Sequence, residues 1–254
     1  MKILGIDIGG TGIKGAIVNT KKGILKTERY RIPTPQPATP DAVLETVTQI
    51  VKEFDWKGPI GCGFPAAIRH EIIKTASNID QSWKGLNAAE RIQQATGCPT
   101  HLVNDADAAG LSEVKFGAGK DEKGVVMMIT CGTGVGSGLF INKRLVPNTE
   151  FGFIHVDNTK AEYYCSNTAR EKENLGWDVW GGRLNKYLKR LEELFWPDMF
   201  IIGGGISKQF DSFSQYIQLD TKVVPAESRN HAGIIGAAIS AQQSISKNLL
   251  KKSK

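Results

Sequence analysis

Cysteine is scarce in this chain: its 254 residues include four, at positions 62, 98, 131 and 165, and no C-x-x-C pair. This spacing predicts neither a zinc site nor a disulfide framework, so we expect reduced thiols. No apolar run reaches the roughly 18 residues that a transmembrane helix needs. The N-terminus turns polar at Asp7, before the apolar core of a signal peptide could form. These absences favour a cytoplasmic protein with no membrane partner.

The two common phosphate-binding motifs give no support to the enzyme classes that use them. The sequence contains no G-x-x-x-x-G-K-[ST], which argues against a P-loop enzyme. G-x-G-x-x-G occurs once, at residues 10–15, but it leads into the strand expected at 13–19 rather than into the helix that a Rossmann dehydrogenase requires. Glycine itself is abundant, with 28 residues, and three glycine turns follow expected strands: DIGGTGIK, CGTGVGSG and IIGGGISK. One such turn usually just reverses the chain, whereas three together indicate ligand sites lined by backbone.

The composition is that of an ordinary folded protein, with 41% hydrophobic and 23% charged residues. No low-complexity linker is present, so we expect any domain boundary to be tightly packed. The net charge of +6 would suit a polyanion, but four of the lysines lie in the last eight residues. We interpret those lysines as a solvated tail and expect no nucleic-acid partner.

The apolar pattern predicts an α/β fold that opens with a meander of strands at 2–8, 13–19 and 23–31. The segment PTPQPATP cannot be regular structure, and Thr39 and Pro40 suit the start of a helix over 41–54. Further strands are expected at 59–68, 99–103, 124–130 and 199–202, and helices at 86–97, 184–195 and about 231–247. We expect a small N-terminal lobe at 1–104, with the C-terminal helix packed on it, and a larger lobe at 105–230.

Asp7 lies directly before the first glycine turn, where a carboxylate would repel a phosphate. A hard cation between the two would remove this conflict. Alternatively, Asp7 caps the turn through local backbone hydrogen bonds. Thr11 and Lys14 are candidates for contacts with phosphate oxygens, although Lys14 could equally be a solvated strand residue.

Asp105 is the candidate for chemistry. Phosphoryl transfer to a hydroxyl group needs a carboxylate that accepts the proton as the new P–O bond forms. Asp105 follows an expected strand and opens an expected helix, so the sequence alone equally favours a plain N-cap.

The succession of a strand, D-I-G-G-T-x-x-K, a meander, G-T-G-x-G-S and G-G-G resembles the ROK family of sugar kinases. The short length and the segments TPQPATP, TASNIDQSW, NDADAAG and LVPNTE are most similar to its polyphosphate-using glucokinase branch. The resemblance covers nearly the whole chain. It implies a two-lobed actin/hexokinase-like (ribonuclease H-like) fold with mixed sheets flanked by helices, a homodimer, and lobes that close over the sugar.

The resemblance also implies roles for particular residues. Asp105 matches the catalytic base, and Asp7 matches a residue that positions a hydrated Mg²⁺. The sugar-binding positions are Asn78, Asn104, Asp105, Glu150 and Glu162. The donor-phosphate positions are Asp7, Gly9, Gly10, Thr11, Gly12, Lys14, Gly132, Thr133, Gly134, Gly204 and Gly205.

The chain departs from the family motif E-x-G-H, because Phe153 stands where the family has a sugar-binding histidine. A phenyl ring cannot make that hydrogen bond, and an unpaired buried polar group costs about 1 to 3 kcal/mol. If residues 152–156 are extended, His155 lies on the same face as Phe153 and could substitute. A surface or packed role for His155 is the alternative. Cys165 alone cannot supply the structural zinc site of many ROK proteins.

We therefore expect an Mg²⁺-dependent glucokinase that transfers a phosphoryl group from polyphosphate to the 6-hydroxyl of glucose, with ATP as a shared or alternative donor. One alternative is an ATP-dependent kinase of another hexose or an amino sugar. Another, motivated by Phe153, is a sugar- or polyphosphate-binding protein without turnover.

Overall fold

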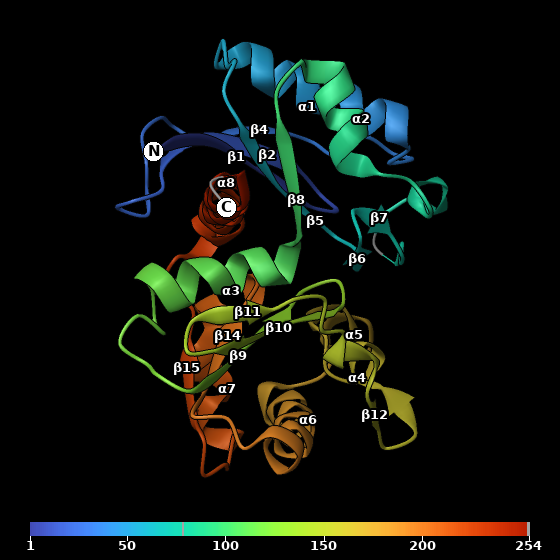
Figure 1. Cartoon of the computed structure of the whole chain (residues 1–254). Helices are drawn as coiled ribbons and strands as arrows, with labels where there is room; N and C mark the ends of the chain where they lie inside the picture. The colour runs from blue at the N-terminus through green and yellow to red at the C-terminus, as the bar shows by residue number, and fades with distance from the viewer. Residues whose placement is uncertain (78, 253–254) are drawn as a thin grey trace. The chain divides into compact units, whose positions relative to one another are not determined.

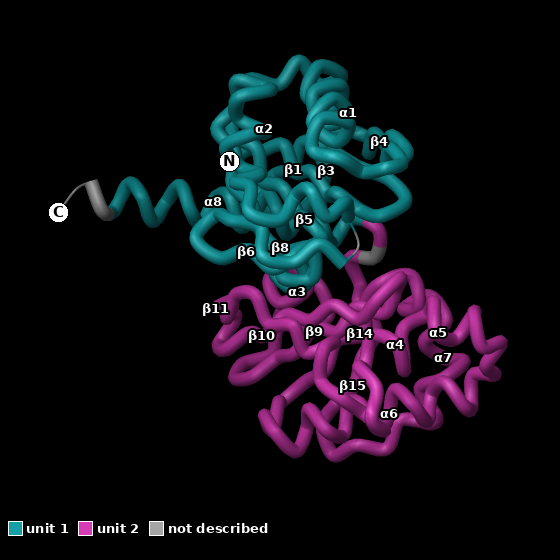
Figure 2. The backbone as a smooth tube through the Cα atoms, turned by 90° about the vertical axis from the view of Figure 1, so that its right-hand side faces the viewer, with its two compact units in different colours: residues 1–112, 231–254 teal, residues 113–230 magenta. Residues whose placement is uncertain are grey.

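A computed structural model describes residues 1–77 and 79–252. The chain forms two compact units (Figure 2). Unit 1 comprises Met1–Ser112 and His231–Lys254, and unit 2 comprises Glu113–Asn230. The fold of each unit is mixed α/β.

Unit 1 is built on a sheet with strand order β3-β2-β1-β5-β8, and β4 also pairs with β2. Strands β1, β5 and β8 are parallel to one another, whereas β2 is antiparallel to β1. The strands are β1 (Lys2–Ile8), β2 (Ile13–Asn19), β3 (Ile24–Leu25), β4 (Tyr30–Ile32), β5 (Ile60–Phe64) and β8 (Thr100–Asn104), with a small hairpin of β6 (Ile68–Arg69) and β7 (Ile72–Ile73). Every residue of β5 is buried, as expected for a central parallel strand covered on both faces.

Helices pack on both faces of this sheet (Figure 1). Helix α1 (Pro40–Glu53) begins with its proline at N1, and α2 (Ala88–Thr96) is capped by Asn87 and ends at left-handed Gly97. Helix α8 (Ala232–Lys252) contacts β1, β5 and β8. A Cβ atom at Gly61 would collide with the backbone oxygen of Ala237. Glycine is therefore what lets α8 approach the sheet closely.

Unit 2 contains a second sheet with strand order β11-β10-β9-β14-β15, in which β9, β14 and β15 are parallel. Its strands are β9 (Val125–Cys131), β10 (Val135–Ile141), β11 (Arg144–Val146), β14 (Met199–Gly203) and β15 (Lys222–Pro225), and a separate hairpin joins β12 (His155–Val156) and β13 (Thr159–Lys160). Its helices are α4 (Ala161–Tyr164), α5 (Asn167–Lys172), α6 (Trp177–Phe195) and α7 (Phe210–Phe213), and α3 (Asp105–Phe116) runs from unit 1 into unit 2. The buried face of α6, including Leu184, Leu188 and Leu191, packs into the core of unit 2.

The structure corrects the strand predicted at 23–31, which is split into β3 and β4. The Thr27 hydroxyl accepts a hydrogen bond from the Ile17 amide at 3.1 Å, where a backbone carbonyl would continue the ladder. A side chain that replaces a backbone acceptor interrupts strand pairing. Among the described residues, no helix is both long enough and apolar enough to cross a bilayer.

Candidate active site

The carboxyl ends of three parallel strands meet at one edge of the unit 1 sheet. Asp7 of β1 is in register with Gly63 of β5, and Phe64 of β5 is in register with Asn104 of β8. Asp105 follows β8 directly and opens α3. Ligands of open α/β sheets bind outside the carboxyl ends of the strands. The two candidate carboxylates, Asp7 and Asp105, are therefore carried at the ligand-binding edge.

The first glycine turn joins β1 to β2, and the Gly9 amide closes it by donating to the Gly12 carbonyl at 3.2 Å. Thr11 and Gly10 are exposed. The amides of Gly10, Thr11 and Gly12 donate to no acceptor within the described part of the chain. Three successive unpaired amides suit the oxygens of a phosphate group.

Asp7 is paired with a cation inside the protein. The Lys14 ammonium lies 3.3 Å from Asp7 Oδ2, and the two side chains are 23% and 18% exposed. A Cβ atom at Gly233, in the first turn of α8, would lie 2.8 Å from Cγ of Asp7. The carboxylate therefore also lies against the positive end of the α8 dipole. Within the described residues no turn amide donates to the Asp7 side chain.

Asn104 provides the cap of α3. Its Oδ1 accepts from the amides of Ala106 at 2.8 Å and Asp107 at 3.0 Å, and its Nδ2 donates to the Ala66 carbonyl at 3.1 Å. Asp105 Oδ1 also accepts from the Ala106 amide at 2.8 Å, and the residue is half-buried. The strongest capping interactions thus belong to Asn104. The sugar-binding candidate Asn78 lies outside the described residues.

A pocket of about 310 Å³ in unit 1 adjoins the first glycine turn. Gly9 and Gly10 form part of its wall, together with Ser77 and Asp80. The segment after β4 supplies Thr34, Gln36 and Pro37. Ile8, Ala38, Pro65 and Ile79 complete the lining, so the pocket combines apolar walls with a few polar groups, as small-molecule sites commonly do.

The second and third glycine turns are neighbours in unit 2. Gly203 is in register with Thr130, and a Cβ atom at Gly204 would lie 2.6 Å from the Cys131 carbonyl oxygen. Gly132 donates to the Gly134 carbonyl at 3.0 Å, and its own carbonyl accepts from the Thr168 amide at 3.2 Å. Thr133 and Gly205 are exposed. The predicted donor-phosphate residues of unit 2 therefore come together at the ends of β9 and β14.

Glu150 and Glu162 form a pair of interacting carboxylates in unit 2. Burial raises the pKa of the Glu150 carboxyl, and the negative charge of Glu162 raises the pKa further. Glu162 lies in α4 and is 8% exposed. Neither side chain has a hydrogen-bonded or ion-pair partner within the described residues. Such a pair is suited to accept hydrogen bonds from the hydroxyl groups of a ligand.

The structure gives His155 the surface role rather than the role of a substitute for the family histidine. Residues Phe151–Phe153 form a 3-10 helix rather than an extended strand, so the alternation that would align His155 with Phe153 does not apply. His155 is exposed at the start of β12. The half-buried Phe153 ring instead has the Lys160 ammonium 4.7 Å from its centroid. A cation therefore lies next to the position where the family carries histidine.

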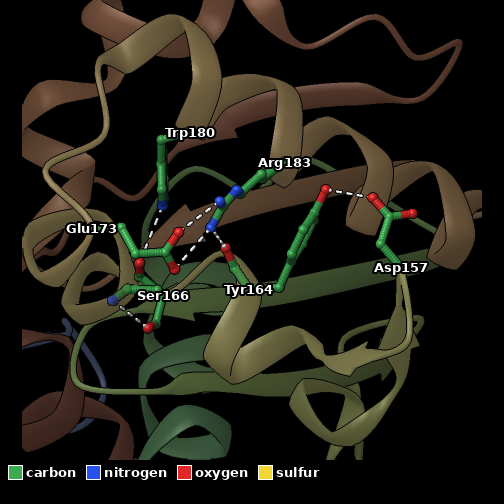
Figure 3. A network of polar contacts seen from close by, with 7 residues as sticks. Asp157, Tyr164, Ser166, Glu173, Trp180 and Arg183 are labelled. Atoms are coloured by element: carbon green, nitrogen blue, oxygen red, sulfur yellow. Dashed lines mark hydrogen bonds and ion pairs between the residues drawn. The ribbon is translucent and has the colours of Figure 1, made fainter.

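A polar network holds α4 and α5 against α6 (Figure 3). Trp180 Nε1 donates to the Ser166 carbonyl at 3.2 Å. Arg183 contacts Glu173 at 2.7 Å and the Tyr164 carbonyl at 3.2 Å. These contacts fix the segment that carries Glu162 and Thr168 against α6. They therefore help to position two groups of the candidate site.

Sequence reasoning missed the side chains that support the glycine turns. Arg31, Thr34 and Gln36 all hydrogen-bond to the first turn, and Thr168 bonds to the second. The proline-rich segment indicated only irregular structure, and no local pattern places 31–36 beside residues 9–11. The alternation of threonine and glutamine with proline is the one signal that could have suggested a fixed polar loop.

The fold and the site together define a sugar kinase of the actin/hexokinase-like fold, and the chain belongs to the ROK family, whose model matches residues 3–170. It is 43% identical to the polyphosphate glucokinase of Mycobacterium tuberculosis over 93% of this chain and 90% of the relative. It is 28% identical to the glucokinase of Streptomyces coelicolor over 94% of this chain and 97% of the relative. The structure of inorganic polyphosphate/ATP-glucomannokinase from Arthrobacter sp. strain KM matches with a TM-score of 0.92 and 45% identity, covering 96% of this chain and 99% of that one. The predicted family and fold class are confirmed.

Proposed function

We propose that this protein is a glucokinase that transfers the terminal phosphoryl group of polyphosphate to the 6-hydroxyl of glucose, and that ATP is an alternative donor. The observation that carries the proposal is the placement of Asp7, the unpaired turn amides and Asp105 at one edge of three parallel strands. The similarity to polyphosphate glucokinases and to a polyphosphate/ATP-glucomannokinase supports the choice of donor and acceptor.

In this proposal Asp105 is the general base. One of its carboxylate oxygens accepts the proton of the sugar 6-hydroxyl. At the same time the hydroxyl oxygen bonds to phosphorus, and the bond from phosphorus to the bridging oxygen of the donor breaks. The Asn104 cap holds the first turn of α3, and therefore the Asp105 backbone, in place. The glycine-turn amides of residues 10–12 would bind donor phosphate oxygens, with Thr11 and Lys14 beside them.

The residues at Asp7 fit a magnesium ion. No group of three or more His, Cys, Asp or Glu side chains that could hold a metal ion occurs among the described residues. Mg²⁺ commonly keeps several waters and binds through one or two carboxylates together with substrate phosphates, so a single carboxylate suffices. Asp7 would hold the ion through water, and the ion would neutralise charge on the donor phosphates.

Unit 2 supplies the remaining groups in this proposal. Glu150 and Glu162 accept hydrogen bonds from sugar hydroxyls. Asn104 and Asn78, which belong to unit 1, are also proposed as sugar-binding residues. Gly132, Thr133 and Gly134 bind the donor, and Gly204 and Gly205 lie further along it. The proposal also includes a cytoplasmic location and a homodimer, and sedimentation velocity of the purified protein tests the homodimer.

The test is the formation of glucose 6-phosphate by the purified protein with Mg²⁺, with polyphosphate or ATP as donor. We expect turnover with polyphosphate and a decrease in kcat of about 10²- to 10⁴-fold in Asp105→Asn. Asp41→Asn is the matched control, because Asp41 is an exposed carboxylate in the first turn of α1. Turnover of mannose or an amino sugar in place of glucose would instead support another acceptor, and binding of glucose without turnover would overturn the enzyme proposal.

A further inference from the structure

The segment 31–36 binds the first glycine turn through three side chains. Thr34 Oγ1 donates to the Gly9 carbonyl at 2.5 Å, Gln36 Nε2 donates to the Gly10 carbonyl at 3.5 Å, and an Arg31 guanidinium nitrogen donates to the Thr11 carbonyl at 2.7 Å. Three successive carbonyls of the turn are thus bonded to side chains of one short segment.

These bonds determine which way the turn amides point. In a trans peptide the C=O of one residue and the N–H of the next point in opposite directions across a rigid plane. Carbonyls of residues 9, 10 and 11 that face the segment 31–36 therefore direct the N–H groups of residues 10, 11 and 12 away from it. These are the amides that have no acceptor within the described residues.

A glycine turn without such bonds would have several accessible orientations of each peptide plane. Glycine populates positive and negative φ about equally, and turns interconvert by flipping the central peptide. The proline-rich chain after Ile32 is stiff, because each proline fixes its own φ. Thr34 is buried, so its hydroxyl is held at a fixed place. A rigid segment thus fixes an intrinsically flexible one.

We propose that Arg31, Thr34 and Gln36 are positioning residues that orient the amides of the first glycine turn toward the donor phosphates. This inference rests on the proposed function, in that it assigns the turn to the phosphoryl donor. The three residues act through the turn backbone. Their loss should therefore weaken binding of the donor and leave binding of the sugar unchanged.

The first experiment measures KM for polyphosphate, KM for glucose and kcat in Thr34→Val and Thr34→Ser. Valine preserves the shape of threonine and removes the hydroxyl, whereas serine retains it. We expect Thr34→Val to raise the polyphosphate KM roughly 5- to 10-fold, the size of one lost hydrogen bond in a positioned site. The glucose KM should stay within about twofold, and Thr34→Ser should restore the donor KM.

Thr48→Val is the matched control. Its hydroxyl also donates to a carbonyl, that of Leu44 at 2.8 Å, but within α1. Both variants lose one hydroxyl-to-carbonyl bond. Only Thr34→Val should change the donor KM. A general loss of stability would instead change the donor KM in both variants, or would raise the KM for both substrates together. Either result would overturn the inference.

Gln36→Ala keeps the inference falsifiable if Thr34→Val fails to fold, because Gln36 is exposed. Arg31→Lys separates positioning from charge: lysine keeps the charge but not the fork geometry of the guanidinium. We expect Arg31→Lys to raise the donor KM as Arg31→Met does. Full activity in Arg31→Lys would show that Arg31 contributes its charge alone.

Calorimetric binding of inorganic polyphosphate distinguishes failure of this inference from failure of the proposed function. If the wild-type protein binds polyphosphate without phosphorylating glucose, the proposed function is wrong, and weaker binding in Thr34→Val would still support the positioning role. If the wild-type protein turns over and Thr34→Val has an unchanged donor KM, the positioning role is wrong and the function stands. Absence of both binding and turnover in the folded wild-type protein would overturn both.

Discussion

The first glycine turn, in unit 1, and the second and third turns, in unit 2, are held in different ways. Side chains of the segment 31–36 bind the carbonyls of the first turn. In the turns of unit 2, hydroxyl groups of Thr168 and Ser207 also bond to carbonyls, but backbone contacts are added: Gly204 lies against Cys131, and the Thr168 amide bonds to the Gly132 carbonyl. A turn held by side chains can be loosened without unfolding, whereas a turn packed against backbone cannot.

A second contrast concerns the polar groups proposed for the sugar. Asn104 in unit 1 already makes three hydrogen bonds to the protein. Glu150 and Glu162 in unit 2 have no partner among the described residues and repel each other. The unit 1 residue is thus rigid before a ligand arrives, whereas the unit 2 pair carries an unfavourable interaction that hydrogen bonds from a ligand would relieve.

The largest effect on stability is expected for Gly204→Ala. Gly204 has φ 80° and ψ −173°, a region that essentially only glycine occupies. The new Cβ atom would also lie 2.6 Å from the Cys131 carbonyl oxygen, which is backbone and cannot move aside. We expect a loss of about 3 kcal/mol in the free energy of unfolding, measured by urea denaturation.

Gly205→Ala is the control for this prediction. A Cβ atom at Gly205 would have no neighbour within 4 Å, and its φ is not positive. Its free energy of unfolding should change by less than about 1 kcal/mol. Equal losses in the two variants would mean that the backbone contact with Cys131 does not hold the third turn.

Gly12→Ala tests a glycine whose neighbour is a flexible side chain rather than backbone. A Cβ atom there would lie 2.5 Å from Arg31 Nε and 2.8 Å from Cζ, but these atoms are the far end of an exposed, flexible side chain that can move away. We expect a loss of less than about 1 kcal/mol in stability, and a donor KM raised roughly 5-fold because Arg31 leaves the Thr11 carbonyl. Steady-state kinetics and urea denaturation measure the two effects.

A double-mutant cycle sharpens this prediction. In an Arg31→Ala background, Gly12→Ala should have little further effect on the donor KM, because both changes remove the same contact. Additive effects of the two substitutions would show that Gly12 and Arg31 act on donor binding independently. The claim that the Arg31 side chain holds the first turn would then be wrong.

The regular elements were largely predictable, because they depend on local periodicity and on strong end signals. Strands β1 and β2 have the predicted bounds, and α2 ends at Gly97 as its sequence indicates. The split of the strand at 23–31 was not predictable, since it depends on the Thr27 hydroxyl meeting the Ile17 amide across the sheet. A side chain that replaces a backbone acceptor leaves no mark on the apolar pattern.

The candidate site was predicted as residues but not as contacts. The glycine turns and Asp105 were identified from motifs, and Lys14 was named as a candidate phosphate contact. The ion pair of Lys14 with Asp7, its partner across the β1–β2 ladder, was not predicted. Arg31, Thr34 and Gln36 were missed because their partners lie about 20 to 26 residues earlier in the chain. Only tertiary structure brings these groups together.

Phe153→His tests the groups proposed to bind the sugar, and a moderate change in the glucose KM is expected. A histidine at this position would supply the hydrogen-bonding group of the family motif, and one added hydrogen bond is worth about 0.5 to 1.5 kcal/mol. We expect the glucose KM to fall roughly 2- to 10-fold with the polyphosphate KM unchanged. Phe153→Leu is the control, since it lacks both the ring and a hydrogen bond and should not improve binding of glucose.

The smallest expected effect is that of Glu162→Gln on the titration of Glu150. Burial is the larger cause of the raised Glu150 pKa, and the charge of Glu162 is the smaller one. Removing that charge should therefore lower the Glu150 pKa without returning it to the usual range, which NMR titration of the side-chain carboxyl measures.

The same substitution should change how stability depends on pH. A raised pKa in the folded state means that stability falls as pH rises from the unfolded pKa through the folded one. The variant should thus match the wild type at low pH and become more stable above this window. A stability difference that is independent of pH would show that the two carboxylates of unit 2 do not interact. The difference between the hydrogen-bonded Asn104 and the unpaired Glu150 would then come only from the burial of Glu150.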